Sequence, residues 1–164
     1  ASATLWAMQR RGPSPNLFSY NAAISAFEKG QRWQGGQLWL WAPRLLQQMR
    51  KELLSPNVTT YSAAISACEA GLRWARALGL LQHMRREAIV PGVVAYNSMI
   101  AACKKCRRWG CAIRLFQDML QGKVKPDAIT YCSMASVCES AGQAHIAEVV
   151  LQSMWRHLRE HSRR

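Results

Sequence analysis

Residues 93–127 read VVAYNSMIAACKKCRRWGCAIRLFQDMLQGKVKPD, and this stretch is one copy of a unit that recurs along the chain. Each copy follows a proline and a polar or small residue, and it opens with a short run that ends in tyrosine. The four openings are PNLFSYN at Pro15, PNVTTYS at Pro56, PGVVAYN at Pro91 and PDAITYC at Pro126. The last two intervals are 35 residues each, and a period of this length indicates a solenoid of stacked units.

Two helices are predicted in each copy, because apolar residues recur at the i, i+3, i+4, i+7 spacing of one helix face. In residues 93–127 the two faces are Tyr96, Met99, Ile100 and Cys103, followed by Ala112, Leu115, Phe116 and Met119. The turn between the helices is expected near residues 106–108. Other copies carry Gly30, Gly71 or Gly142 at this turn, where glycine is expected to adopt the left-handed conformation that ends a helix.

The first interval is six residues longer than the others. Arg32-Trp33 matches Arg73-Trp74, which places the extra residues between Gln34 and Arg44. Six residues turn a helix by about 600°, so an uninterrupted helix would lose the register of its buried face. Proline is poorly tolerated inside a helix and well tolerated in its first turn. A break over residues 36–42 is therefore expected, with a helix that restarts near Pro43.

The unit resembles the pentatricopeptide repeat of the P type. The resemblance is carried by V-x-x-Y-N-x-x-I at the start of the first helix, A-x-x-L-F-x-x-M in the second and K-P-D at the end. A tetratricopeptide array has a shorter period and fits less well. The resemblance implies an all-α fold in which antiparallel helical hairpins stack into a right-handed superhelical solenoid.

The chain is expected to contain about four repeats and a preceding half-repeat. Residues 1–16 align with the second helix and closing loop of a repeat, because Leu5 and Met8 match Leu81 and Met84. The repeats follow at 17–57, which includes the insertion, 58–92, 93–127 and 128–164, which includes a C-terminal helix and tail. An array that begins in mid-repeat is expected to be a fragment of a longer one.

Charge favours a polyanionic partner. The 164 residues include 22 Lys and Arg but only 9 Asp and Glu, giving a net charge of +13 and a pI near 10.2. A basic surface without a dedicated ligand is the alternative. No uncharged apolar run approaches the roughly 18 residues that a transmembrane helix needs, so no membrane association is expected.

The six cysteines do not have the spacing of a zinc site. Cys68, Cys103 and Cys138 occupy the same place in three copies, and Phe27 occupies it in the first. A position shared by cysteine and phenylalanine indicates packing, so buried thiols without metal are expected. The sequence contains no recognisable motif of an enzyme, so no catalysis, cofactor or small-molecule substrate is expected.

Tryptophans at 33, 74 and 109 follow the turn between helices and are expected to pack there, although tryptophan also stacks on bases. Trp39 and Trp41 are placed in the insertion, either as a partner-binding knob or as a cover for the break.

The resemblance also implies which residues contact RNA. One repeat addresses one base, through the residue after the tyrosine and the residue after the closing proline. These base-contact pairs are Asn21 with Asn57, Ser62 with Gly92, Asn97 with Asp127, and Cys132 with Ser162. An Asn-Asp pair implies U and an Asn-Asn pair implies C or U, so the expected site is pyrimidine, unknown, U, unknown.

The resemblance implies two further sets of RNA-contacting residues. Apolar residues that sandwich the bases correspond to Phe18, Thr59, Val94 and Ile129, and phosphate contacts correspond to Lys29 and Lys105. The alternative is that the asparagine and aspartate after proline only cap helices and that the lysines interact with helix dipoles. An asparagine inside a helix is a poor helix former, which favours a binding role for Asn21 and Asn97.

The expected function is sequence-specific binding of single-stranded RNA without catalysis. By resemblance, such a protein acts in mitochondria or plastids in the processing, editing, stabilisation or translation of transcripts, and other proteins are further candidate partners. The alternative is a helical-repeat scaffold for protein–protein interaction. A basic inner groove would favour RNA, and a neutral or apolar groove would favour protein.

Overall fold

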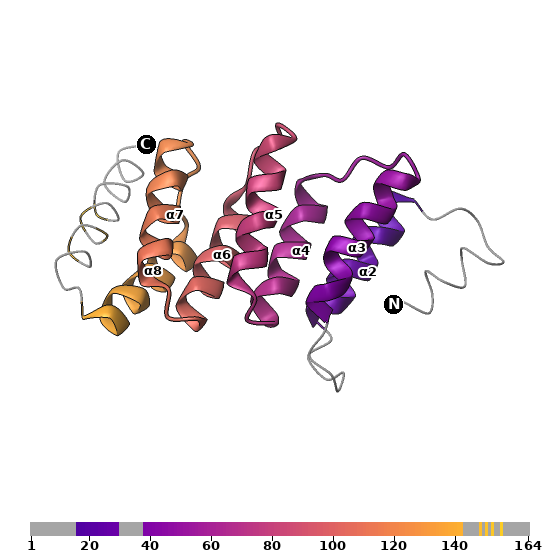
Figure 1. The fold of residues 1–164 in the computed structure, drawn as a ribbon. Helices are drawn as coiled ribbons and strands as arrows, with labels where there is room; N and C mark the ends of the chain where they lie inside the picture. The colour runs from indigo at the N-terminus through magenta and orange to yellow at the C-terminus, as the bar shows by residue number, and fades with distance from the viewer. Residues whose placement is uncertain are drawn as a thin grey trace.

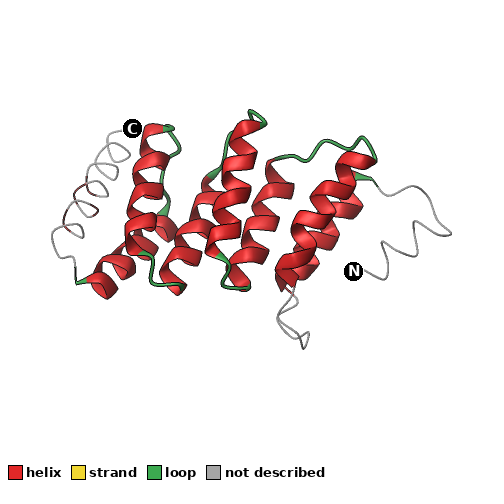
Figure 2. Cartoon of the chain, viewed as in Figure 1, coloured by secondary structure: helices red, strands yellow, loops and turns green. Residues whose placement is uncertain are grey.

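A computed structural model describes residues 16–29 and 38–142, together with residues 148, 150, 152 and 155. Seven α-helices occupy this part of the chain (Figure 1). They are α2 (Leu17–Lys29), α3 (Leu38–Lys51), α4 (Val58–Ala70), α5 (Trp74–Arg86), α6 (Val93–Lys105), α7 (Trp109–Gln121) and α8 (Ala128–Ala141). The described residues contain no strand (Figure 2). None of these helices is both long and apolar enough to cross a membrane.

The helices form hairpins that stand side by side in a row (Figure 1). The first helices of the hairpins make one layer, in which α2 packs on α4, α4 on α6 and α6 on α8. The second helices make the other layer: α3 contacts α2 and α4, α5 contacts α4 and α6, and α7 contacts α6 and α8. The backbones of α3, α5 and α7 do not approach one another closely. Long side chains span the space between these helices, as the contacts from Arg50 to His83 and from Arg85 to Asp118 show. The predicted all-α solenoid of antiparallel hairpins is confirmed.

The recurring apolar residues form the core. The tyrosines that mark each repeat are buried, and Tyr20, Tyr61, Tyr96 and Tyr131 are at most 7% exposed. The prolines that precede the first helices, Pro56, Pro91 and Pro126, are buried as well. Each repeat therefore contributes the same side chains to one continuous core, as a solenoid requires.

Helices α4 and α8 begin with capping boxes. Asn57 accepts a hydrogen bond from the backbone N–H of Thr60 at 3.0 Å, and Asp127 accepts one from that of Thr130 at 2.8 Å. Each threonine hydroxyl accepts the cap residue's own N–H in return. These reciprocal bonds satisfy donors that a helix start otherwise leaves unpaired.

Most helices end in a left-handed residue that is not glycine. Positive φ angles of 55–58° occur at Leu53, Leu72, Ala88, Arg107 and Lys123. The prediction of a left-handed glycine is correct for Gly142, with φ 65°, and wrong for Gly71, with φ −84°; Gly30 lies outside the described residues. In the turn after α4, the left-handed residue is Leu72, which follows Gly71. The bond from Arg73 N to the Cys68 carbonyl, at 2.9 Å, closes a Schellman motif there.

Helix α3 corrects the expected position of the insertion. It begins at Leu38 and continues through Pro43, so the predicted break over residues 36–42 is wrong for 38–42, and the restart near Pro43 is wrong. In this register Trp39, not Trp33, is the equivalent of Trp74. The extra residues therefore fall between α2 and the start of α3. Because they precede the helix, they do not rotate its buried face.

The cysteine column is buried as predicted. Cys68, Cys103 and Cys138 are at most 2% exposed. Burial raises the pKa of Cys68 to about 11, against a weaker lowering effect of Arg76. Burial, with smaller contributions from Cys111 and Cys106, raises the pKa of Cys103 to about 12. These thiols are therefore neutral packing groups at physiological pH.

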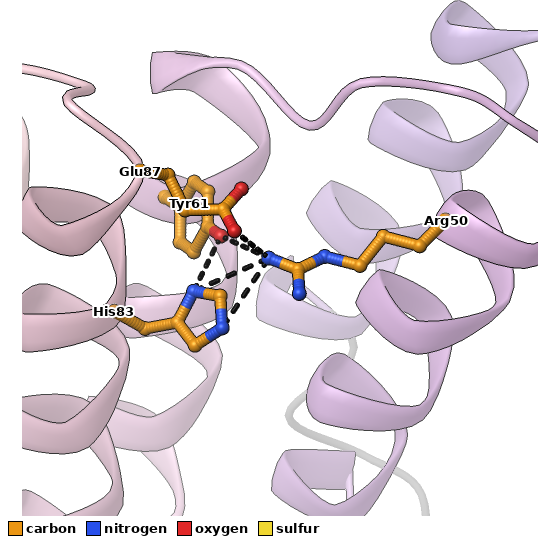
Figure 3. Close-up of polar contacts among 4 residues, drawn as sticks. All are labelled: Arg50, Tyr61, His83 and Glu87. Atoms are coloured by element: carbon orange, nitrogen blue, oxygen red, sulfur yellow. Dashed lines mark hydrogen bonds and ion pairs between the residues drawn. The ribbon is translucent and has the colours of Figure 1, made fainter.

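Polar contacts between the second helices and the tyrosine hydroxyls join successive repeats. Arg50 of α3 donates to the Tyr61 hydroxyl at 3.2 Å and pairs with Glu87 at 2.7 Å (Figure 3). The Tyr61 hydroxyl also lies 2.8 Å from Nδ1 of His83. Burial raises the pKa of Tyr61, although the hydrogen bond from Arg50 lowers it. We call this set of contacts the first rung.

The second rung repeats the first one repeat further on. Arg85 donates to the Tyr96 hydroxyl at 2.8 Å and to Asp118 at 3.2 Å. Asp118 stands in the place that His83 occupies in the first rung. Leu120 occupies, one repeat further on, the position that Arg50 and Arg85 have in theirs. An arginine therefore links repeats at two of the described junctions and is replaced at the next.

Candidate nucleic-acid interface

The pair Asn97 and Asp127 is brought into direct contact. Asn97 lies in the second turn of α6 and Asp127 caps α8, so they belong to adjacent first helices. The Asn97 amide Nδ2 donates to the Asp127 carboxylate, at 3.0 Å from Oδ1 and 3.2 Å from Oδ2. Although 30 positions separate them in sequence, they form one half-buried polar group.

Asp127 is held as a carboxylate. Partial burial raises its pKa, but hydrogen bonds from the Thr130 backbone N–H, the Asn97 amide and the Thr130 hydroxyl outweigh burial and lower the pKa below its ordinary value. An ionised carboxylate only accepts hydrogen bonds. The amide group facing Asp127 must therefore be the Nδ2 of Asn97 and not its oxygen.

The pair Asn21 and Asn57 is bridged by a third residue. The Thr60 hydroxyl lies 2.7 Å from Oδ1 of Asn21 and 2.9 Å from Oδ1 of Asn57. No direct hydrogen bond joins the two asparagines within the described contacts. This pair is therefore less tightly coupled than Asn97 and Asp127.

The two remaining pairs are built differently. Ser62 is buried, and its hydroxyl donates back to the Val58 carbonyl of its own helix at 2.7 Å. Gly92, its expected partner, supplies no side chain to contact a base. Cys132 is exposed, and Ser162 lies outside the described residues. At Ser62 and Gly92 a base would find few polar groups.

The second residue of each first helix projects into solvent. Phe18 is 80% exposed, Val94 63% and Ile129 65%, and Thr59 is exposed as well. Large apolar side chains are normally buried, so their recurrence on the surface at one helical position indicates a contact surface. These residues lie three positions before the base-contact residues and so flank them on the same layer of helices.

The two predicted phosphate contacts have different outcomes. Lys105 forms an ion pair with Glu69 of the preceding first helix, and their side chains are 49% and 21% exposed. Part of its charge is therefore offset within the protein. Lys29 ends α2, and its side chain is outside the described part of the chain.

Positive charge is concentrated away from the first helices. Together α2, α4, α6 and α8 contain three basic and three acidic residues, so they carry no net charge. In contrast, α3, α5 and α7 contain seven basic residues and one acidic residue, a net charge of +6. The first helices therefore make no basic surface by themselves, and the excess positive charge lies in the second layer, the turns and the terminal segments.

The tryptophans after the turns are partly exposed. Trp74 is half-buried, and the Arg108 guanidinium lies over its ring at 5.1 Å from the centroid. Trp109 is 44% exposed. Packing between helices therefore accounts for only part of each ring.

Thr60 and Thr130 were missed as members of the site. Both are fully buried, and each hydroxyl reaches the base-contact asparagine of the preceding repeat. The sequence did carry a signal, because Asn-x-x-Thr and Asp-x-x-Thr at a helix start have the spacing of a capping box. That spacing predicts the cap but not the contact with the neighbouring helix.

Among the described residues, no group of three or more His, Cys, Asp or Glu side chains is arranged to hold a metal ion.

Layered helical hairpins with a 35-residue period define this molecule as an α-solenoid repeat protein. Three family models match it: the PPR repeat family at residues 91–139, the pentatricopeptide repeat domain at 41–70 and the PPR repeat at 59–89 and 129–157. Together these matches cover more than half of the sequence, and the chain belongs to the pentatricopeptide repeat family. Comparison with curated protein sequences gives no significant match.

Solved structures of pentatricopeptide repeat proteins are similar to this one. The PPR domain of Arabidopsis thaliana protein-only RNase P 1, in complex with tRNA, matches with a TM-score of 0.77 and 15% identity, over 92% of this chain and 77% of that one. The maize protein PPR10 matches with a TM-score of 0.74 and 26% identity, over 95% of this chain. PPR10 in complex with an 18-nt psaJ RNA element matches with a TM-score of 0.75 and 21% identity. The present chain spans 22% of the PPR10 chain.

Proposed function

We propose that this protein binds single-stranded RNA along its first helices and that successive repeats face successive bases. The observation that carries the proposal is the Asn97–Asp127 group, flanked by the exposed Val94 and Ile129. Polar groups that meet a base edge between apolar side chains that contact base faces are what recognition of unstacked RNA requires. Similar structures of PPR10 and of the RNase P domain contain RNA, which supports the same ligand class here.

The pair Asn97 and Asp127 is expected to select uracil. After its bonds to Asp127 and Thr130, the Asn97 amide retains one N–H and one oxygen lone pair. Uracil offers the complementary set at its Watson–Crick edge, an acceptor carbonyl beside the N3–H donor. The pair Asn21 and Asn57 is assigned to a pyrimidine.

The test is a binding titration with short single-stranded RNAs that differ only at the base facing the third repeat. Asn97→Thr is expected to shift preference from U toward G, with a change of about 1–3 kcal/mol if the contact equals a good base-edge pair. Ser62→Ala is a matched control, because that hydroxyl is already bonded within its own helix. Unchanged base preference in Asn97→Thr would contradict the assignment.

A protein–protein scaffold is the second candidate, and the absence of net charge on the first helices favours it. Phe18, Val94 and Ile129 would then bind an apolar partner surface. The two functions differ in their salt dependence, because binding to RNA phosphates weakens steeply with salt. Failure to bind any RNA of the series at low salt would favour the scaffold.

On the basis of the family, we further propose that the protein acts without catalysis in mitochondria or plastids, in the processing, editing, stabilisation or translation of transcripts. Crosslinking to cellular RNA followed by sequencing of the bound fragments tests this proposal. Enrichment of organellar transcripts with a pyrimidine and a U two positions apart is expected, whereas enrichment of nuclear transcripts alone would contradict it.

A further inference from the structure

The threonine at the third position of a first helix contacts the base-contact asparagine of the repeat before it. The Thr130 hydroxyl lies 2.6 Å from Oδ1 of Asn97, and the Thr60 hydroxyl lies 2.7 Å from Oδ1 of Asn21. Both threonines are fully buried, so they do not themselves meet a ligand. Their contacts with the asparagines nevertheless decide which amide N–H and oxygen lone pair remain free to bind a ligand.

The Thr130 hydroxyl has two acceptors within hydrogen-bond distance. The Thr130 hydroxyl accepts the backbone N–H of Asp127 at 3.2 Å, and a hydroxyl has one proton to donate. Asp127 Oδ1 already accepts the Thr130 backbone N–H and the Asn97 amide. The hydroxyl proton is thus shared between Asn97 Oδ1 and Asp127 Oδ1, and Asn97 Oδ1 is the nearer acceptor, at 2.6 Å against 2.8 Å.

Asn97 is therefore held at both ends of its amide. Asp127 accepts from Nδ2, and Thr130 donates to Oδ1. A flipped amide would place Oδ1 against the carboxylate of Asp127, and the two acceptors would repel each other. One amide orientation is fixed before any ligand arrives, and the donor and acceptor left over point in a defined order.

At the first pair Thr60 acts without a carboxylate. Asn57 Oδ1 accepts from the Thr60 backbone N–H, and its amide has no bond to Asn21 among the described contacts. Within the described part of the chain, the Thr60 hydroxyl is the one side chain that bonds to Asn21, so the orientation of this amide depends there on a single hydrogen bond. Where the equivalent residue is Ala95, the preceding Ser62 turns to its own helix instead.

We propose that Thr60 and Thr130 are positioning residues for base selection: each fixes the amide of the preceding repeat's asparagine and so sets the choice between uracil and cytosine. This inference rests on the proposed RNA-binding function. Uracil presents a donor at N3 where cytosine presents an acceptor, and at position 4 uracil has an acceptor carbonyl where cytosine has a donor amino group. A fixed amide distinguishes these edges, whereas an amide that is free to flip accepts both.

The test uses Thr130→Val, which keeps the shape of the side chain and removes the hydroxyl, and Thr130→Ser, which keeps the hydroxyl. Affinities are measured for RNAs that carry U or C opposite the third repeat. We expect Thr130→Val to reduce the U-to-C affinity ratio by about three- to tenfold, the worth of one hydrogen bond. Thr130→Ser is expected to retain the ratio, and Thr60→Val to act only on the base opposite the first repeat.

A separate control distinguishes positioning from stability. Ser98 and Ser66 share a hydroxyl hydrogen bond of 2.7 Å between α6 and α4. Ser98→Ala therefore also removes a bond between first helices, one that involves neither Asn97 nor Asp127. Urea unfolding is measured for every variant. A Thr130→Val protein that loses stability but keeps the wild-type base ratio would overturn the inference and leave the proposed function intact. A wild-type protein that binds RNA without any preference at that base would overturn the inference and the uracil assignment. One that binds none of these RNAs at low salt would overturn the proposed function as well.

Discussion

The guanidinium of Arg85 donates to the hydroxyl of Tyr96 at 2.8 Å, which connects the second helix of one repeat to the first helix of the next. Arg85→Leu places at this position the residue found at 120, its equivalent one repeat later. The nearly buried Tyr96 then loses a hydrogen-bond partner, and the free energy of unfolding is expected to fall by about 1 kcal/mol. Urea denaturation measures the change. Arg86→Leu, at an exposed neighbouring position, is the control. Equal losses of unfolding free energy in both variants would mean that the Arg85–Tyr96 hydrogen bond has no specific role in stability.

Leu53 is expected to be a site where glycine stabilises the protein. This residue has a left-handed φ of 58° and is 94% exposed, so its side chain adds strain and little packing. Leu53→Gly is expected to raise the free energy of unfolding by about 0.5–1 kcal/mol, because relief of roughly 1–2 kcal/mol of strain exceeds the entropic cost of glycine. Leu120→Gly, inside α7, is expected to destabilise. A lower melting temperature for Leu53→Gly would contradict this account.

Pro43 lies inside α3 and lacks the N–H that would bond to the carbonyl of residue 39. Replacement by leucine, the residue at the equivalent position 78, is expected to stabilise the protein by about 1–3 kcal/mol. Pro56→Ala is the contrasting variant, because Pro56 is buried ahead of the cap of α4 and its loss is expected to destabilise. Thermal unfolding of both variants tests the pair. No gain for Pro43→Leu would mean that the helix has already adapted to the proline.

Stability is expected to fall at high pH because of the buried thiols. The pKa of Cys68 is about 11 and that of Cys103 about 12 in the folded protein, against an ordinary value of 9.0. A raised pKa means that the folded state keeps protons which the unfolded state releases, so stability is constant below about pH 9 and falls as the pH rises toward 12. Cys68→Ala is expected to flatten the decline, whereas Cys132→Ala, at an exposed thiol, should not. The loss of stability is measured from the midpoints of urea unfolding between pH 8 and 11.

Glu69 is expected to restrain RNA binding by pairing with Lys105. Glu69→Gln frees the ammonium group, and affinity for RNAs of every sequence is expected to rise at low salt. Lys105→Ala is expected to weaken all sequences alike and to reduce the salt slope by about 0.7, the value of one phosphate contact on a single strand. Binding titrations at several salt concentrations measure both. A change in base preference in either variant would contradict a phosphate role for Lys105.

The repeated elements could be predicted from sequence, because each has a local cause that recurs every 35 residues. The buried tyrosines and the turn after Lys105 follow directly from the apolar spacing. The expected position of the insertion is wrong because Arg32-Trp33 has the same residues as Arg73-Trp74, which begins α5 at Trp74. That local match is misleading, and the register of the buried face of α3 gives the correct alignment. The left-handed Leu72 was missed because a Schellman motif forms there despite the glycine one residue earlier.

The candidate site was predictable in part. The choice of Asn97 and Asp127 follows from family resemblance, and in the structure Nδ2 of Asn97 lies 3.0 Å from Oδ1 of Asp127. The inward turn of Ser62 and the ion pair of Lys105 depend on neighbours in adjacent helices, which a single-repeat pattern does not include. Thr60 and Thr130 were hidden for the same reason, since capping explains them fully within their own helix.

The charge of the two layers is uneven, and on the proposed function this would separate the first encounter with RNA from the comparison of bases. A helix with its side chains is about 10 Å across, and physiological salt screens charges over about 8 Å. The field of α3 and α5 is therefore strongest over the layer of second helices and weaker at the asparagines in the layer of first helices. On the proposed function, an RNA approaching from solution is expected to be drawn first to the layer of second helices and only afterwards to exchange into the neutral layer of first helices. Added salt should accordingly slow the encounter while leaving the ranking of bases unchanged.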